Sequence, residues 1–400
     1  FYIQPTYEEI ISKKNSRFLL FSAPGASGKT ALAKFIARKK MGLYWDLSQI
    51  KLGDNSFHGT LLRAIGADKL AGYFEKINSG KTVLILDAFD EAEMISGRSG
   101  IETFLKDLDD ITKDSTAPSI CLFGRTESAV YIAEYCKEHN INYSHYEISF
   151  FEEYNAKKFV MEKVIHDGNS VTDVVEKCIN EQFSIIKQLL GKDELAKTFL
   201  GYAPVLEALA GAFDKERNTI KLLERLKGES VTSTRIIFDI LDELLDREQK
   251  KVCNALKEKW TKTYPEFADW ADVYSKKEQM VRLVEYIVLE EIEADSYYLN
   301  EKIPDELYVD YIDAIKGFLP QHPFLQNIVK RKCIDFSGPA FRDFAVSYVL
   351  SVREYEDLAL QYFENYMHAF RFPSQLLFDF YVEFSDGIMR GALFPLMYDS

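Results

Sequence analysis

The chain has 400 residues, of which 47% are hydrophobic, and this is enough for a sizeable core spread over roughly two to four domains. A formal net charge of -14 argues against a general affinity for nucleic acid or anionic membranes. No apolar run approaches the roughly 18 residues of a membrane-spanning helix. The chain begins at Phe1 without a signal peptide, and we expect it to be a fragment of a longer protein.

The first 150 residues alternate short apolar runs with helical patterns such as 31–38 and 101–108. Near-continuous apolar runs are typical of strands buried on both faces, and their alternation with helices indicates an α/β domain built on a parallel sheet. The predicted strands are 18–21, 42–47, 81–87, 119–123 and 144–148.

Beyond residue 151 helical spacing dominates. We expect helices over 156–165, 172–190, 193–213 and 218–226, the last capped by Asn218. A second helical block begins near 232, and 248–349 mixes helices with short extended pieces. The aromatic residues beyond 351 are interpreted as core or interdomain packing rather than a ligand site: Tyr362, Phe363, Tyr366, Phe370, Phe372, Phe378, Phe380, Tyr381 and Phe384.

The five cysteines are widely spaced and include no C-x-x-C pair. This pattern is typical of a reducing compartment, so we expect a cytoplasmic protein without a zinc site. The cysteines are Cys121, Cys136, Cys178, Cys253 and Cys333.

A small-residue loop lies between the first apolar run and the first helical pattern, in the order of a phosphate-binding P-loop. Gly25 and Gly28 can take backbone angles that other residues avoid, which lets the loop turn its N–H groups toward a phosphate. We expect Lys29 to reach the β- and γ-phosphates and Thr30 to bind Mg²⁺. An ordinary strand-to-helix turn is the alternative, because Ala23 stands where the usual motif begins with Gly. The predicted nucleotide-binding residues here are Ala23, Pro24, Gly25, Ala26, Ser27, Gly28, Lys29, Thr30 and Ala31.

A second motif closes the apolar run 81–87. Asp87 ends this buried strand, a position from which a carboxylate beside a P-loop can hold Mg²⁺. The next residue, where many NTP-hydrolysing enzymes carry Glu, is Ala88. Asp90 and Glu91 are then the carboxylates available to orient or deprotonate the attacking water. The alternative is that they form an acidic pair at a helix N-terminus.

The stretch from Asp87 to Glu91 resembles the Walker B form of NACHT-type NTPases, which belong to the STAND group of P-loop ATPases. Residues 120–126 resemble the family's sensor strand, in which Arg125 matches the Arg that senses the γ-phosphate. The alternative for this residue is a surface Arg at a strand end. Residues 201–205 resemble a turn whose Pro packs on adenine, and Pro204 matches it unless it only ends a helix. Gly338 stands where relatives often carry a His that touches the β-phosphate of ADP.

The resemblance implies a P-loop NTPase domain (1–150), a helical domain (151–230), a winged-helix-like domain (231–350) and the start of a further helical domain (351–400). It also implies slow ATP hydrolysis with ATP/ADP and Mg²⁺, self-association in the ATP state and a role in defence signalling, including antiviral defence. Effector and sensor domains of the same chain and an unknown trigger ligand would then act with it. The alternatives are an AAA+-like remodelling ATPase and a scaffold that holds nucleotide without turnover.

Overall fold

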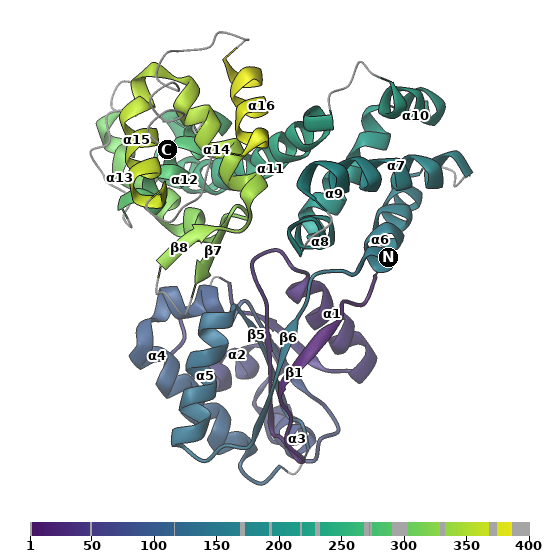
Figure 1. Cartoon of the computed structure of the whole chain (residues 1–400). Helices are drawn as coiled ribbons and strands as arrows, with labels where there is room; N and C mark the ends of the chain where they lie inside the picture. The colour runs from purple at the N-terminus through teal and green to yellow at the C-terminus, as the bar shows by residue number, and fades with distance from the viewer. Residues whose placement is uncertain are drawn as a thin grey trace. The chain divides into compact units, whose positions relative to one another are not determined.

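The computed structural model divides into two compact units, Phe1–Asn155 and Ala156–Ser400 (Figure 1). The predicted division at residues 150, 230 and 350 remains a prediction. The structure describes residues 2–48, 50–115, 117–168, 173–191, 194–216, 218–228, 233–267, 272, 274–289, 303–328, 333–367 and 374–385.

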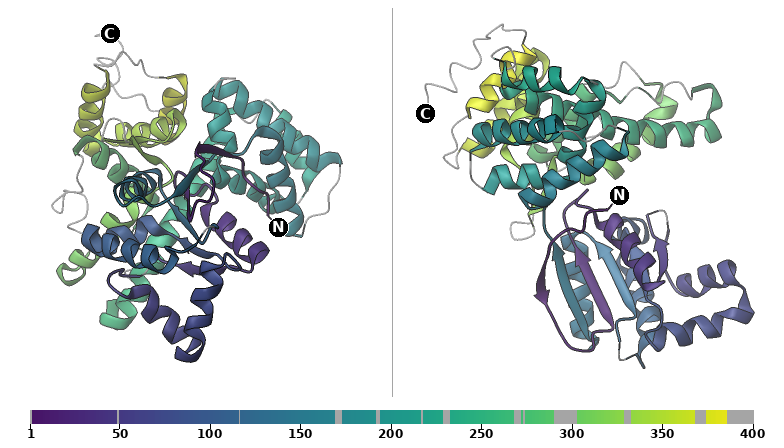
Figure 2. Two further views of the ribbon diagram at one scale, coloured as in Figure 1. Left: turned by 90° about the horizontal axis from the view of Figure 1, so that it is seen from below. Right: turned by 90° about the vertical axis from the view of Figure 1, so that its right-hand side faces the viewer.

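A six-stranded sheet with the order β1-β6-β2-β5-β4-β3 forms the centre of the first unit (Figure 2). Its strands are β1 (Tyr7–Ile11), β2 (Phe18–Ser22), β3 (Leu43–Asp46), β4 (Leu84–Asp87), β5 (Ile120–Gly124) and β6 (Tyr143–Ile148). All are parallel except β1, which pairs antiparallel with β6 at the edge. The five predicted strands are confirmed, and the carboxyl ends of parallel strands meet at one edge of the sheet, where ligands bind in open α/β folds.

Helices cover both faces of this sheet, which explains why its strands read as continuous apolar runs. The helices of the first unit are α1 (Lys29–Lys40), α2 (Ser56–Ile65), α3 (Ala67–Asn78), α4 (Phe89–Thr112) and α5 (Thr126–Glu138). On the face of α1, Leu32 and Ala33 pack against Phe21, Ile85 and Phe123.

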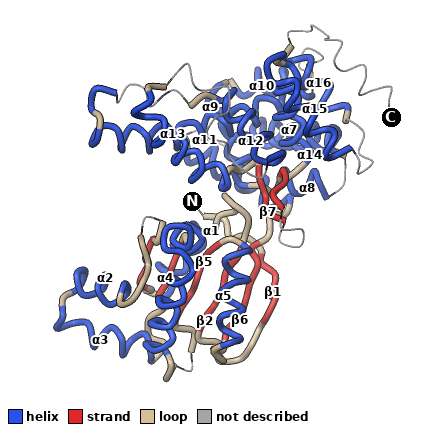
Figure 3. The backbone as a smooth tube through the Cα atoms, turned by 90° about the vertical axis from the view of Figure 1, so that its left-hand side faces the viewer, coloured by secondary structure: helices blue, strands red, loops and turns tan. Residues whose placement is uncertain are grey.

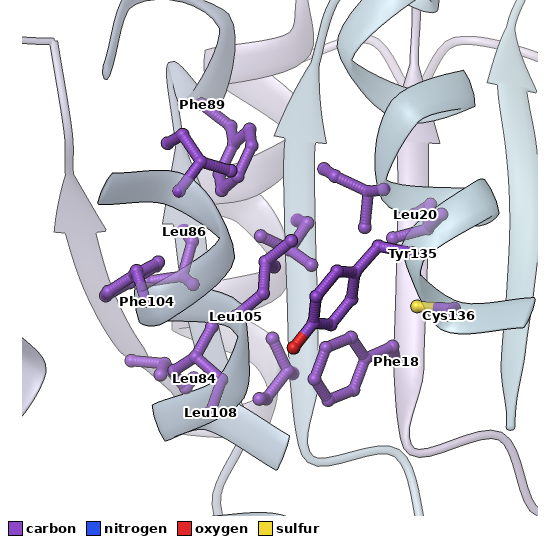
Figure 4. Close-up of a cluster of buried hydrophobic side chains, with 14 of the residues drawn as sticks. Phe18, Leu20, Leu84, Leu86, Phe89, Phe104, Leu105, Leu108, Tyr135 and Cys136 are labelled. Atoms are coloured by element: carbon purple, nitrogen blue, oxygen red, sulfur yellow. The ribbon is translucent and has the colours of Figure 1, made fainter. Parts of the chain in front are cut away.

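The opposite face holds the larger core, formed by strand residues together with α4 and α5 (Figure 4). Phe18, Leu84 and Leu86 of the strands lie against Phe104 and Leu108 of α4, and each is 0 or 1% exposed. Full burial of a side chain of this kind contributes about 1.5–3 kcal/mol of transfer free energy. Packing on both faces of the sheet stabilises the edge at which the parallel strands end.

The second unit is almost entirely helical in the part that the structure describes (Figure 3). Its helices are α6 (Glu153–His166), α7 (Asp173–Leu190), α8 (Glu194–Gly201), α9 (Ala203–Lys215), α10 (Thr219–Lys227), α11 (Ser233–Thr263), α12 (Lys276–Leu289), α13 (Asp305–Phe318), α14 (Pro339–Ser351), α15 (Glu356–Met367) and α16 (Gln375–Phe384). A two-stranded antiparallel sheet, β7 (Leu325–Ile328) and β8 (Cys333–Phe336), lies between α13 and α14 in sequence.

Two of the predicted helices can be compared with the structure at their N-terminal caps, Tyr202 and Asn218. The predicted helix 193–213 is wrong as a single element, because the chain leaves helical geometry at Tyr202 and α9 restarts with Pro204 in its first turn. Proline suits that position, since it has no N–H to leave unpaired there. The cap at Asn218 is confirmed: its side-chain oxygen accepts hydrogen bonds from the backbone N–H groups of Ile220 and Lys221, both at 3.2 Å.

Aromatic side chains pack the C-terminal part of the second unit. Phe344 of α14 contacts Phe238, Phe380 and Phe384 with ring-centroid distances of 5.1 Å in each case. The prediction of core packing is therefore confirmed for Tyr362, Phe363, Phe380 and Tyr381, which are buried, and for Phe384, whose ring contacts Phe344. Phe378 is half-buried, and the side chain of Tyr366 together with residues 370 and 372 lies outside the described part of the chain. The winged-helix-like domain at 231–350 remains a prediction.

Gly338 precedes α14 with φ 178°, an extended angle that any residue adopts. A Cβ there would meet Phe341 at an ordinary 3.6 Å. Neither the backbone nor its surroundings within the second unit therefore requires glycine at this position.

Candidate nucleotide-binding site

The predicted P-loop connects the carboxyl end of β2 to α1, and a hydrogen bond of 3.3 Å from Ala23 N to Gly124 O ties its start to the end of β5. Gly28 caps α1 with φ +89°, and a Cβ there would find nothing within 4 Å. Glycine is needed at this residue because of its backbone angle and not because of space. Gly25 is not among the positive-φ residues of the described part of the chain, and the second left-handed residue of the loop is Ala26, with φ +55°.

The side chain of Lys29 lies back over the loop. Its Nζ donates hydrogen bonds to the carbonyl oxygens of Ala23 at 3.0 Å and Pro24 at 2.8 Å. Ser27 Oγ donates to the same Pro24 oxygen at 2.5 Å. The loop is thus closed around an ammonium group, which is the group that the phosphates of a nucleotide would meet.

The four other charged groups predicted for the site act on Lys29 electrostatically. Burial lowers the pKa of Lys29 to about 8, the carboxylates of Asp90, Asp87 and Glu91 oppose this shift, and Arg125 adds to it. These residues come from β4, α4 and the end of β5, so the strand order has gathered them beside the P-loop. The predicted site residues of the first unit therefore form one cluster.

Asp87 ends β4 and is 2% exposed. Ala88 follows with φ +59° and ψ 40°, a left-handed conformation that costs a non-glycine residue roughly 1–2 kcal/mol. This turn lets α4 begin at Phe89, whose ring is fully buried in the larger core. Asp90 and Glu91 consequently lie in the first turn of α4.

The two carboxylates of that turn have different surroundings. Asp90 Oδ2 forms an ion pair of 3.2 Å with Arg125 Nε. Burial, followed by the carboxylates of Asp90 and Asp46, raises the pKa of Glu91 to about 7. A base with this pKa is matched to proton transfer near neutral pH. Arg125 is therefore not a lone surface residue, and Glu91 is the better candidate for the base.

Thr30 and Asp87 fit a magnesium ion shared with a nucleotide. Thr30 is exposed at the start of α1, and α1 packs against β4, which carries Asp87. One hydroxyl and one carboxylate are a suitable protein contribution for Mg²⁺, which keeps several waters and takes its other ligands from phosphates. No group of three or more His, Cys, Asp or Glu side chains that could hold a metal was found among the described residues.

Sequence reasoning missed Tyr44. Its hydroxyl donates a hydrogen bond to Asp87 Oδ2 at 2.9 Å, because β3 pairs with β4 and opposes Tyr44 to Ile85, two residues before Asp87. The aromatic run around Tyr44 predicts a strand, but the neighbouring strand is decided by the sheet order. No local signal in the sequence gives that order.

Pro204 lies in the second unit, near the start of α9. It lines a cleft of about 320 Å³ whose other lining residues are mainly charged: Lys163, Asp167, Glu207, Ala208, Gly211, Asp214, Glu243, Leu244 and Arg247. Packing of Pro204 on an adenine remains a prediction.

Four of the cysteines, Cys121, Cys136, Cys178 and Cys253, are buried and free, and the side chain of Cys333 lies outside the described residues. Burial raises the pKa of Cys121 and Cys136 to about 12, which makes these thiols poor nucleophiles. Among the described helices, none is both long and apolar enough to cross a membrane.

Comparison with known proteins gives one family match. Residues 19–136 match the model of the ATPase family associated with various cellular activities (AAA). This range begins in β2 and ends in α5, so it contains the P-loop, Asp87, the acidic pair and Arg125. A comparison with curated proteins finds no match.

Three solved structures show weak similarity. The FIGL-1 AAA domain in complex with ADP is 15% identical with a TM-score of 0.31, covering 56% of this chain and 70% of its own. The Thermotoga maritima RuvB Holliday junction branch migration motor is 12% identical with a TM-score of 0.34, covering 82% and 86%. Cdc6p from Pyrobaculum aerophilum is 10% identical with a TM-score of 0.32, covering 87% and 88%. Likenesses at this level say nothing about the activity of this chain.

The matched range and the cluster around Lys29 agree on the same residues. Residues 19–136 of the first unit are similar to the AAA ATPases, and this range contains the P-loop and the charged residues around Lys29.

Proposed function

We propose that this chain binds ATP with Mg²⁺ and hydrolyses it, using Glu91 as the base, Asp87 and Thr30 at the metal, and Lys29 with Arg125 at the phosphates. The observation that carries the proposal is the gathering of these charges from three neighbouring strands around the P-loop lysine. When bound, Mg²⁺ neutralises charge on the β- and γ-phosphates. The protein residues would position the nucleotide and the attacking water.

In this proposal Glu91 accepts the proton of the water that attacks the γ-phosphorus. Its pKa of about 7 leaves a large ionised fraction near neutral pH. Arg125 supplies positive charge for the phosphoryl oxygens, where a cation stabilises the charge that builds in the transition state. In the described conformation Arg125 is paired with Asp90, so its orientation is already fixed at the edge of the site.

The family match favours an ATPase module of the AAA kind over the NACHT-type interpretation. One observation keeps the NACHT-type switch as a second candidate: Ala88 follows Asp87, and the carboxylates come three and four residues after it. Under that proposal ATP would promote self-association, and effector and sensor domains of the same chain would answer an unknown trigger in cytoplasmic defence signalling. Sustained turnover would not be needed.

A turnover assay beside a sizing experiment separates these candidates. A remodelling ATPase should release phosphate continuously, at about one turnover per second or faster. A switch should release about one phosphate per chain and then slow, and its hydrodynamic size should differ between ATP and ADP. ATP binding without any phosphate release would support the scaffold. Absence of Mg²⁺-dependent ATP binding would contradict all three.

A further inference from the structure

The phenol of Tyr44 is hydrogen-bonded to Asp87, the carboxylate that would bind the metal in the proposed site. Tyr44 Oη donates to Asp87 Oδ2 at 2.9 Å, and no other hydrogen bond to this carboxylate was found within the described part of the chain. Because side chains alternate along strands and Tyr44 opposes Ile85 in the register, Tyr44 and Asp87 lie on the same face of the sheet. That face is the one covered by α1.

The ring of Tyr44 is held from the other side by α1. Lys34 Nζ lies 5.5 Å from the ring centroid, within the range of a cation–π contact. Lys34 is four residues after Thr30 on this helix, so the two lie on the same helix face. Thr30 is thus linked to Asp87 through α1, Lys34 and Tyr44.

We propose that Tyr44 is a positioning residue for the metal: its hydroxyl fixes one oxygen of Asp87, so that the other oxygen is presented toward the ion held with Thr30 and the nucleotide. This inference rests on the proposed function. Mg²⁺ demands near-octahedral geometry at short range, so the orientation of each carboxylate matters. Ligating carboxylates are commonly held in this way by a hydrogen-bond donor behind them.

The chemistry of the phenol fits a permanent donor. A phenol has an ordinary pKa of about 10, so its hydroxyl is a hydrogen-bond donor near neutral pH. Tyr44 can therefore orient the carboxylate through the hydrogen bond that it donates to Asp87.

The test measures metal dependence of nucleotide binding rather than turnover, using the 400-residue chain and ADP as the probe. ADP affinity is measured by calorimetry with Mg²⁺ and with a chelator, for the native chain and for Tyr44→Phe. We expect Tyr44→Phe to lose about tenfold or more of the tightening that Mg²⁺ gives. Affinity in chelator should stay as in the native chain, whereas the melting temperature without ligand should fall, because the buried Asp87 carboxylate loses the hydrogen bond from Tyr44.

Tyr131→Phe is the matched control, because Tyr131 donates a similar hydrogen bond of 3.2 Å to Glu102, between α5 and α4. It should leave the Mg²⁺ dependence unchanged. In an Asp87→Asn background, Tyr44→Phe should have no further effect, since the carboxylate that it orients is gone. Replacing Mg²⁺ by Mn²⁺ gives a second readout: the electron paramagnetic resonance spectrum of the bound Mn²⁺ with ADP should differ between Tyr44→Phe and the native chain.

Three outcomes would overturn the inference. The first is native Mg²⁺ dependence in Tyr44→Phe. The second is an equal loss of affinity in Mg²⁺ and in chelator, which indicates a structural role. The third is an undiminished effect of Tyr44→Phe in the Asp87→Asn background. If the native chain binds ADP more tightly with Mg²⁺ but Tyr44→Phe gives one of these three outcomes, only the inference about Tyr44 fails and the proposed function stands. If the native chain shows no such tightening, both fail.

Discussion

The adjacent carboxylates Asp90 and Glu91 should respond differently when each is changed to its amide. Asp90 is engaged with Arg125 at 3.2 Å, whereas the pKa of Glu91 is raised to about 7. We expect Glu91→Gln to slow ATP hydrolysis by about a hundredfold or more, the effect of losing a positioned base. ATP affinity should stay close to that of the native chain, because glutamine keeps the shape of the side chain and loses only its ability to accept a proton.

Asp90→Asn should retain turnover but shift its pH dependence. The Asp90 carboxylate raises the pKa of Glu91, whereas Arg125 lowers it. Replacing the Asp90 carboxylate by an uncharged amide therefore favours ionised Glu91. The acid limb of kcat/KM reports the free enzyme, so in the native chain it should lie near pH 7, with the rate falling as pH drops and Glu91 becomes protonated. In Asp90→Asn this limb should move to lower pH by about one unit.

The assay is steady-state phosphate release from about pH 5 to pH 9, a range that brackets the expected limb, with ATP binding measured separately by calorimetry. Glu127→Gln is a suitable control, because Glu127 is an acid in the first turn of α5, as Glu91 is in α4. Its acid limb should match that of the native chain. The reasoning is refuted if Glu91→Gln hydrolyses ATP at the native rate, or if the limb in Asp90→Asn stays in place or moves upward.

Three further predictions concern the P-loop. Lys29→Ala should weaken ATP binding by at least a few kcal/mol in calorimetry, since it removes a charge-assisted contact, and unchanged affinity would contradict the P-loop assignment. Because the pKa of Lys29 is lowered from 10.5 to about 8, the unfolded chain binds more protons between these values, so the free energy of unfolding should rise with pH there in the native chain and less so in Lys29→Met. Gly28→Ala should lower the free energy of unfolding by about 1–2 kcal/mol through its left-handed backbone alone. Gly53→Ala is the control, because a Cβ there also meets nothing within 4 Å and its φ is not positive, and an equal loss in both variants would refute the backbone explanation.

The strands that sequence reasoning finds are those buried on both faces. β2, β4 and β5 read as apolar runs because helices cover them from two sides. β1 escapes the same reasoning, since four of its five residues are exposed and its pairing depends entirely on β6. The break at Tyr202 could have been predicted, because a proline two residues later is a common helix start.

The residues of the candidate site likewise separate into those that local sequence predicts and those that it does not. Lys29, Thr30 and Asp87 can be read from local motifs, because a P-loop and a strand-end carboxylate are each contained in one short stretch. The side chains that contact the site from other strands cannot be predicted from local motifs. Arg125 meets Asp90 only because β5 pairs with β4, and Tyr44 meets Asp87 only because β3 is the next strand. Strand order is set by packing of the whole domain, and the sequence around Arg125 or Tyr44 does not indicate it.

The left-handed turn at Ala88 explains why the candidate base comes four residues after Asp87 and not directly after it. A side chain at residue 88 would project from a backbone with φ +59°, outside both the strand and the helix. The turn allows the N–H groups of Glu91 and Ala92 to donate to the Ala88 carbonyl at 3.2 Å, so the first turn of α4 closes directly over the end of β4. With Phe89 fixed in the core, Asp90 and Glu91 are brought back beside Asp87. Under the proposed function, the short connection between strand and helix would supply at Glu91 the carboxylate that many NTP-hydrolysing enzymes carry directly after the strand-end Asp.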